Sequence, residues 1–103
     1  MPGRTLNIVG CGRLGRTLAR LFARERAFVV QDVCTRTPAS ARDAVQFVGS
    51  GHAVDSLPAM RPAPAWMIAT PDAEIGASCD ALVAAGRLRR GDVVFHCSGS
   101  LPS

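Results

Sequence analysis

The fold is decided by residues 8–15, which read Ile8-Val9-Gly10-Cys11-Gly12-Arg13-Leu14-Gly15. They contain the pattern G-x-G-x-x-G directly after a short apolar run and directly before a helix-like pattern. In such a loop the first glycine allows a tight turn, the second leaves room for a pyrophosphate at the backbone, and the third lets the helix pack closely on the sheet. Free N–H groups and the positive end of the helix dipole then hold the anion. The predicted cofactor-binding residues of this loop are Gly10, Cys11, Gly12, Arg13, Leu14 and Gly15.

Working outward, the composition describes one small globular domain spanning residues 1–103, of which 48% are hydrophobic. All 12 basic residues are Arg, and the net charge of +4 suits an anionic cofactor. The arginines are scattered and Tyr is absent, so we expect no nucleic-acid partner. No apolar run reaches the roughly 18 residues of a membrane span. We expect no membrane partner and, because no signal peptide precedes the first strand, a cytoplasmic protein.

Cysteine and histidine spacing gives no sign of a metal site. No two of the four cysteines form a C-x-x-C pair, and neither histidine lies at ligand spacing from a cysteine. We therefore expect no metal and free thiols in a reducing compartment. The four cysteines are Cys11, Cys34, Cys79 and Cys97, and the two histidines are His52 and His96.

Hydrophobic periodicity alternates between strand and helix along the whole chain. Strands are expected over residues 5–9, 27–34, 52–54, 65–69 and 92–96. Helices are expected over residues 13–24, 38–48 and 72–85, the second capped by Thr37 and started by Pro38. The positions expected to face the core are Leu14, Leu18, Leu21 and Phe22 in the first helix, Ala41, Ala44, Val45 and Val48 in the second, and Ile75, Cys79, Leu82 and Val83 in the third.

This alternation predicts an α/β fold, a doubly wound, Rossmann-like parallel sheet of about five strands in the order 3-2-1-4-5. Ligands of such sheets bind beyond the carboxyl ends of the strands, where the strand order reverses. Residues 10–15, 35–37 and 70–72 should therefore converge there, with residues 97–100 nearby.

The end of the second strand discriminates between cofactors. An NAD site places an acidic residue there, about 20 residues after the glycines, for the ribose 2′-hydroxyl. Here the end reads Thr35-Arg36-Thr37, and Asp32 lies inside the strand. Arg36 can pair with a 2′-phosphate, and the two threonines can donate hydrogen bonds to it. We therefore predict NADP, with NAD as the alternative. FAD would leave Arg36 without a partner. The plainer interpretation is that Arg36 is a solvated loop residue and Thr37 only a helix cap.

Four motifs together resemble a known family. They are Gly10-Cys11-Gly12-Arg13-Leu14-Gly15, Cys34-Thr35-Arg36-Thr37, Ala69-Thr70-Pro71-Asp72-Ala73-Glu74-Ile75 and Val94-Phe95-His96-Cys97-Ser98-Gly99-Ser100. The chain resembles the N-terminal NAD(P)-binding domain of a bacterial oxidoreductase family related to pyrroline-5-carboxylate reductase and 6-phosphogluconate dehydrogenase. The resemblance implies that Thr70 and Pro71 pass beside the nicotinamide ribose. It also implies that Ser98 and Gly99 face the nicotinamide and the substrate.

Proteins of that family continue into a helical domain that completes the substrate site and dimerises, whereas this chain ends at Ser103. We therefore expect the cofactor half alone, with its C-terminal helical domain absent and without turnover of its own. We also expect a homo-oligomer, because strand five would be an uncovered edge. The sequence identifies no catalytic acid or base. His96 is expected to pack in the core or at the edge, and Asp72 and Glu74 to complement a helix dipole.

The sequence leaves three functions open. The first is an NADP-dependent oxidoreductase acting on a small molecule that the sequence does not name. The second is a non-catalytic nucleotide-sensing module, in which binding alone shifts the state of a partner. The third is an S-adenosylmethionine-dependent methyltransferase, against which the Arg at the end of strand two argues, because that fold requires an acidic residue there.

Overall fold

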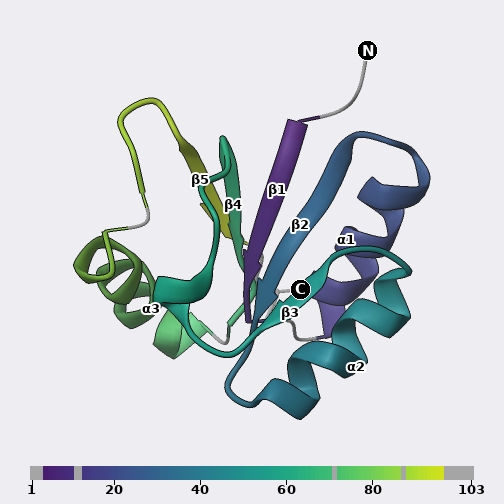
Figure 1. The fold of residues 1–103 in the computed structure, drawn as a ribbon, viewed down its shortest axis with the longest axis horizontal. Helices are drawn as coiled ribbons and strands as arrows, with labels where there is room; N and C mark the ends of the chain where they lie inside the picture. The colour runs from purple at the N-terminus through teal and green to yellow at the C-terminus, as the bar shows by residue number, and fades with distance from the viewer. Residues whose placement is uncertain (1–3, 11–12, 71, 87, 97–103) are drawn as a thin grey trace.

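The computed structural model describes residues 4–10, 13–70, 72–86 and 88–96. Five parallel strands form one sheet in the order β3-β2-β1-β4-β5, as the sequence predicts. Figure 1 shows that β1, the first strand in the chain, lies in the middle of the sheet. The strands are β1 (Arg4–Val9), β2 (Phe28–Cys34), β3 (His52–Val54), β4 (Ala65–Ile68) and β5 (Val93–His96).

Helices cover both faces of this sheet. The helices α1 (Arg13–Arg24) and α2 (Pro38–Val48) lie side by side on one face, whereas α3 (Asp72–Ala84) and the short 3₁₀ helix η1 (Leu57–Ala59) pack on the other. The predicted helix bounds agree with these to within one residue. Among the described residues, no helix is long and apolar enough to cross a bilayer.

The α2 helix begins and ends as its sequence predicts. The Thr37 side chain accepts a hydrogen bond of 3.1 Å from the backbone N–H of Ser40, and Pro38 occupies the first turn, where its missing N–H costs nothing. At the other end Gly49 adopts a φ of 83° and donates its N–H to the carbonyl of Val45. Both ends of the helix are therefore fixed by local chemistry.

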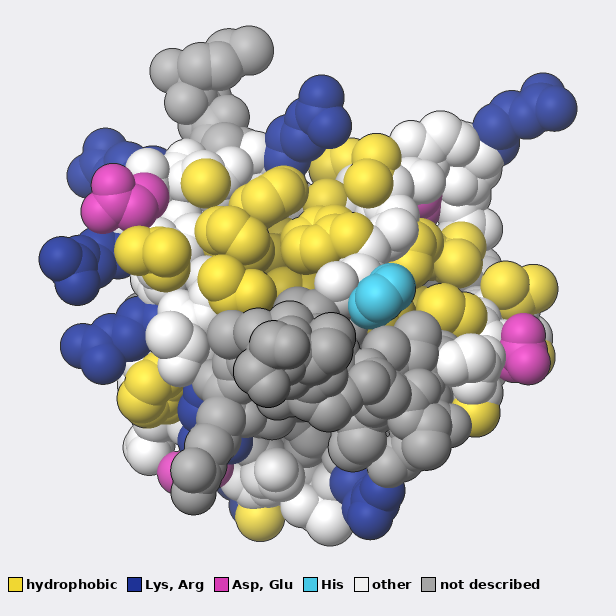
Figure 2. All heavy atoms as spheres, turned by 180° about the vertical axis from the view of Figure 1, so that it is seen from behind, with side chains coloured by type: hydrophobic (Ala, Val, Ile, Leu, Met, Phe, Trp, Pro, Cys, Tyr) yellow, Lys and Arg dark blue, Asp and Glu magenta, His cyan; other side chains and the backbone are white. Residues whose placement is uncertain are grey.

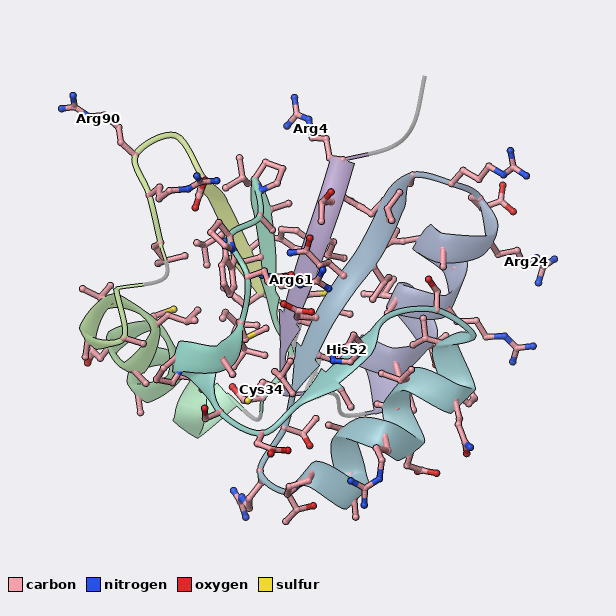
Figure 3. All side chains as sticks on the ribbon, viewed as in Figure 1. Arg4, Arg24, Cys34, His52, Arg61 and Arg90 are labelled. Atoms are coloured by element: carbon pink, nitrogen blue, oxygen red, sulfur yellow. The ribbon has the colours of Figure 1, made fainter. Side chains whose placement is uncertain are left out.

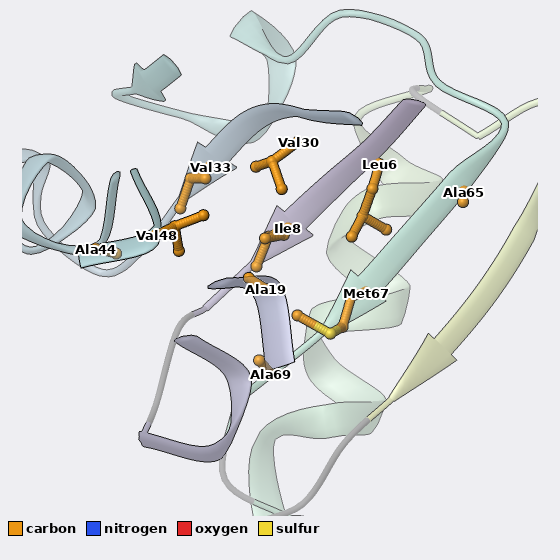
Figure 4. Close-up of a cluster of buried hydrophobic side chains, with 10 residues drawn as sticks. All are labelled: Leu6, Ile8, Ala19, Val30, Val33, Ala44, Val48, Ala65, Met67 and Ala69. Carbon is orange, nitrogen blue, oxygen red and sulfur yellow. The ribbon is translucent and has the colours of Figure 1, made fainter. Parts of the chain in front are cut away.

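Two hydrophobic clusters hold the layers together, one on each face of the sheet. On the α1 and α2 side, Leu6, Ile8 and Met67 from the central strands meet Ala19 of α1 and Val48 of α2, as Figure 4 shows. On the other side the members are Val9, Cys34, Met60, Trp66, Ile68 and Leu82. All four residues of β4 are buried, which confirms the burial on both faces predicted from its continuous apolar run.

Two residues predicted to face the core do not. Leu21 of α1 is 48% exposed, and Val83 of α3 is 66% exposed. The packed face of α1 is centred on buried Ala19, and at about 100° per residue Leu21 points almost the opposite way. Val83 directly follows buried Leu82 and is turned about 100° from it. Of the other predicted positions, the side chains of Leu14 and Ile75 lie outside the described part of the chain.

A bulge in β2 carries a polar network that the sequence did not reveal. Leu6 pairs with Val30 and Ile8 with Val33, so Asn7 lies opposite two residues, Gln31 and Asp32. The buried Asn7 Oδ1 accepts hydrogen bonds from the Asp32 backbone N–H at 3.1 Å and from Gln31 Nε2 at 3.0 Å. Its Nδ2 donates to the carbonyl of Arg61. The network therefore ties the segment between β3 and β4 to β1 and β2.

Candidate functional site at the carboxyl ends of the strands

The ends of β2, β1 and β4 meet at one edge of the sheet. The Gly10 N–H donates to the carbonyl of Cys34 at 2.7 Å, and the Ala69 N–H donates to the carbonyl of Val9 at 2.8 Å. These bonds hold the start of the glycine loop between the end of β2 and the loop after β4. Of the segments predicted to converge, the structure thus brings together Gly10, residues 35–37 and Thr70. Residues 97–100 lie outside the described part of the chain.

Gly10 is required both by its conformation and by its surroundings. Its φ is +74°, in the region that side chains disfavour. A Cβ built there would lie 2.5 Å from Thr70 Cγ2 and 3.2 Å from the carbonyl carbon of Ala69. The loop after β4 therefore packs directly against the glycine turn.

The rest of the predicted glycine loop is described only in part. Gly15 is buried in the first turns of α1, as expected for a glycine that brings a helix close to the sheet. Arg13 and Leu14 begin α1, with side chains outside the described part of the chain, and Cys11 and Gly12 lie outside it altogether.

The end of β2 presents hydroxyls and a guanidinium. The Thr35 hydroxyl donates to the carbonyl of Thr37 at 2.8 Å, so its proton is used within the turn. The Thr37 hydroxyl accepts from Ser40 and keeps its own proton for donation. Arg36 is exposed between them. Of the two threonines predicted to donate to a phosphate, Thr37 is therefore the better placed.

Asp32 is the carboxylate of β2 that lies nearest to the carboxyl end of the strand, but its side chain is bound elsewhere. It is fully buried and accepts three hydrogen bonds from Arg61, at 2.7 Å from the backbone N–H, 2.8 Å from Nη2 and 3.3 Å from Nε. The hydrogen bond and the charge of Asp32 raise the pKa of Arg61. In Figure 3 Arg61 lies over the strands, whereas Cys34 marks the end of β2. Asp32 thus serves the network around Asn7.

Of the two residues predicted to pass beside the nicotinamide ribose, Thr70 is described. Its Oγ1 accepts a hydrogen bond of 3.4 Å from the Ser78 hydroxyl of α3. Ser78 was not foreseen, because a serine in mid-helix carries no signal that it meets a particular loop. Pro71, Ser98 and Gly99 lie outside the described part of the chain.

Asp55 is a second residue at this site that the sequence did not reveal, and it lies on the β3 side of the end of β2. Val54 pairs with Cys34, so Asp55 leaves β3 beside the start of the Thr35–Thr37 turn. Burial of the Cys34 thiol, together with the negative charge of Asp55, raises the pKa of that thiol. The carboxylate of Asp55 is exposed at the same edge that carries Arg36.

Neither a metal centre nor a core histidine is found in the described part of the chain. No group of three or more potential ligands among His, Cys, Asp and Glu lies together there. His96 is exposed on β5, which agrees with the edge position, one of the two positions expected for it. Cys34 and Cys79 are free thiols, as predicted.

Comparison with solved structures shows the same fold in two larger proteins. One is a protein from Bacteroides fragilis that carries the provisional name NADP oxidoreductase, with a TM-score of 0.79 and 24% identity over 98% of this chain. The other is the arogenate dehydrogenase of Synechocystis, with a TM-score of 0.75 and 21% identity over 91% of this chain. This chain spans 38% and 32% of their lengths.

At these identities the likeness establishes the fold, and no curated protein sequence matches the chain. The model of the Rossmann-like domain family matches residues 2–102, almost the full length. The parallel sheet, its strand order and the close-packed glycine turn at the reversal point all agree with that match. The chain therefore belongs to the Rossmann-like domain family.

Proposed function

We propose that this domain binds NADP(H) across the carboxyl ends of β1, β2 and β4, as the cofactor half of an oxidoreductase. The reaction is hydride transfer between the nicotinamide and a small molecule. The observation that carries the choice of NADP is the contrast at the end of β2. Asp32 is buried against Arg61, whereas Arg36 is exposed beside the Thr37 hydroxyl. A 2′-phosphate would meet a cation and a donor there, and no carboxylate of β2.

The described residues fit such a cofactor. Because Gly10 has no Cβ and packs against Thr70, the turn at the start of α1 stays narrow, and the helix dipole favours a pyrophosphate. We assign the pyrophosphate to residues 10–15, the 2′-phosphate to residues 35–37 and the nicotinamide ribose to Thr70 and Pro71. Ser98 and Gly99 are proposed for the substrate side.

Bound NADP(H) supplies the hydride chemistry, and the residues of the chain bind and orient it. Ser78 positions Thr70, because the serine hydroxyl donates to Thr70 Oγ1 and leaves the threonine proton to be given to a ligand. The geometry supports binding more fully than it supports proton transfer, so a nucleotide-sensing module is the second candidate. A methyltransferase has less support, because Asp32 does not reach the end of β2.

The test is calorimetric binding of NADP and NAD to the wild type and to Arg36→Ala. We expect the substitution to weaken NADP by about 1.5–3 kcal/mol, the range for a hydrogen bond to a charged group, and NAD much less. Arg42→Ala is the matched control, since Arg42 is an exposed arginine of the same region on α2. Equal losses for both nucleotides in Arg36→Ala would show that Arg36 does not contact the 2′-phosphate.

A further inference from the structure

Strand β5 has one row of backbone hydrogen-bonding groups that faces away from the sheet. It is the last strand in the order β3-β2-β1-β4-β5, and no described strand pairs with its outer side (Figure 1). The Val93 N–H donates to the carbonyl of Pro64 at 2.9 Å, which fixes the side of the strand that faces β4. Successive peptide groups of a strand point to alternate edges. The carbonyls of Asp92 and Val94 and the N–H groups of Val94 and His96 therefore point outward.

These outward groups are complementary to themselves when the strand is reversed. A two-fold axis perpendicular to the sheet at Val94 would set Val94 opposite Val94 of a second copy. The same axis would set Val93 opposite Phe95 and Asp92 opposite His96 of the second copy. The two copies of Val94 would then exchange N–H to carbonyl bonds, and each His96 N–H would meet an Asp92 carbonyl. This register therefore gives every outward group named above a partner.

The side chains match in the same register on both faces of the sheet. Phe95 packs against the cluster on the α1 side, so Val93, two residues earlier, projects to that face as well. There the register pairs one apolar side chain with the other. On the opposite face it pairs the Asp92 carboxylate with the exposed His96 imidazole, whose N–H can donate to it. The turn orients Asp92, because its Oδ2 accepts from the Arg89 backbone N–H at 2.9 Å, and its Oδ1 can accept from a partner.

We propose that two copies of this chain pair through β5 about a two-fold axis at Val94, so that their sheets become one continuous sheet. The occupant of the open edge is a second copy, because the acidic and the imidazole side chain meet only when this strand pairs with itself. An axis at Val93 would instead set His96 opposite Arg90, which offers the imidazole no acceptor. The proposal concerns assembly and does not depend on the nucleotide.

Disulfide cross-linking tests the register. Val94→Cys would place two thiols directly opposite each other, where Cα atoms about 5.5 Å apart are within disulfide range. Val93→Cys is the matched control, because this neighbouring residue is also exposed but would lie about 8 Å from its own counterpart, too far for a disulfide. Wild type measures the background from the native cysteines. After mild oxidation we expect at least about fivefold more covalent dimer from Val94→Cys than from either control on non-reducing electrophoresis.

A charge substitution tests the polar pair. His96→Glu would set two carboxylates opposite each other at two symmetric positions, and we expect it to weaken self-association about tenfold in static light scattering. His52→Glu is the matched control, because His52 is an exposed histidine of the other edge strand, β3, and should leave self-association unchanged. Thermal unfolding of each variant checks that the exposed substitutions leave the fold intact.

Three results would overturn the proposal. Equal cross-linking of Val93→Cys and Val94→Cys would exclude the two-fold axis at Val94. Cross-linking of both variants at the wild-type background would mean that the edge of β5 is covered by a strand other than that of a second copy, or by none. Equal effects of His96→Glu and His52→Glu would exclude the pairing of His96 with Asp92 of the second copy.

Discussion

The two ends of the sheet are built differently. At the β3 end, the segment after a three-residue strand is tied to the sheet by Asn7, Asp32 and Arg61. At the β5 end, the strand from Val93 to His96 carries no Asp, Glu, Lys or Arg, and both Val93 and Val94 are exposed, by 48% and 39%. Edge strands are normally protected by charge, proline or a covering segment. The segment that follows β3 is therefore held against the sheet by polar contacts, whereas β5 exposes apolar side chains of a kind suited to being covered.

An exposed apolar surface near α1 and β5 adds to this contrast between the two ends of the sheet. Figure 2 shows hydrophobic side chains gathered in one broad patch on the side opposite to that of Figure 1. Partly exposed Phe22, Phe28 and Phe95 come together from α1, β2 and β5 with ring centres 5.1–6.5 Å apart. An apolar surface of this kind commonly marks an interface.

The largest effect is expected at Gly10, between these two ends, where the turn after β1 packs between the end of β2 and the loop after β4. Gly10→Ala combines a disfavoured φ with a clash against Thr70 and the backbone of Ala69, so we expect a loss of about 3 kcal/mol in the free energy of unfolding, together with loss of NADP binding. Gly49→Ala is the control, because Gly49 has a similar φ of +83° and nothing within 4 Å of a built Cβ. Its loss should be about 1 kcal/mol. Similar losses for the two variants in urea unfolding would mean that the clash with Thr70 adds little to the cost of Gly10→Ala.

The second prediction concerns the polar network at the β3 end. Asp32→Ala removes a buried carboxylate that accepts three hydrogen bonds and should lower the free energy of unfolding by about 3 kcal/mol. Asp43→Ala breaks an ion pair with Arg16 in which the aspartate is 70% exposed, and should cost less than about 1 kcal/mol. Urea unfolding of both variants checks the ranking, and equal costs would show that the β3 end does not depend on this network.

The sequence predicted the regular part of this molecule well and its polar interior poorly. Helix α2 was predictable because Thr37, Pro38 and Gly49 act locally, and β4 because its four apolar residues form an unbroken run. The role of Asp32 was not predictable, because its partner Arg61 lies 29 residues away and meets it only through the crossing from β3 to β4. Ser78 and Asp55 were missed for the same reason, since their importance depends on tertiary neighbours. The exposed side of Leu21 shows that an apolar residue near helical spacing need not face the core.

The third prediction concerns the β5 end. We expect the chain to self-associate at tens of micromolar, and Val93→Lys to weaken this at least about tenfold by placing a charge on the edge strand. Val29→Lys is a matched control, because Val29 is also 48% exposed but lies on β2. Static light scattering measures both variants. A monomeric wild type, or equal weakening by the two substitutions, would contradict a homo-oligomeric interface at β5.

The smallest effect is expected in the response of the β2–β3 region to alkaline pH. The pKa of the Cys34 thiol is raised above its ordinary value near 9.0, first by burial and then by Asp55. Above pH 9 the unfolded state therefore releases a proton that the folded state keeps, so stability is complete below pH 9 and falls as pH rises toward the folded pKa. The loss is at most about 1.4 kcal/mol per pH unit.

The chain contains neither Lys nor Tyr, so few other groups ionise between pH 9 and 11. Urea unfolding at pH 8 and pH 10 should show the decline in wild type and a smaller one in Cys34→Ala. The same decline in stability from pH 8 to pH 10 in both proteins would mean that groups other than the Cys34 thiol cause it.

The central place of β1 has a consequence for how the chain is made. During synthesis β1 can pair with β2 once residue 34 has emerged, but its other side finds its partner only when residues 65–68 appear. Until then a nascent chain presents an apolar strand with one open row of backbone groups, and such edges recruit foreign strands. A ribosome that pauses after residue 34 has emerged and before residues 65–68 have emerged would prolong this exposure, so we expect codon usage in the corresponding later interval to affect the yield of folded protein.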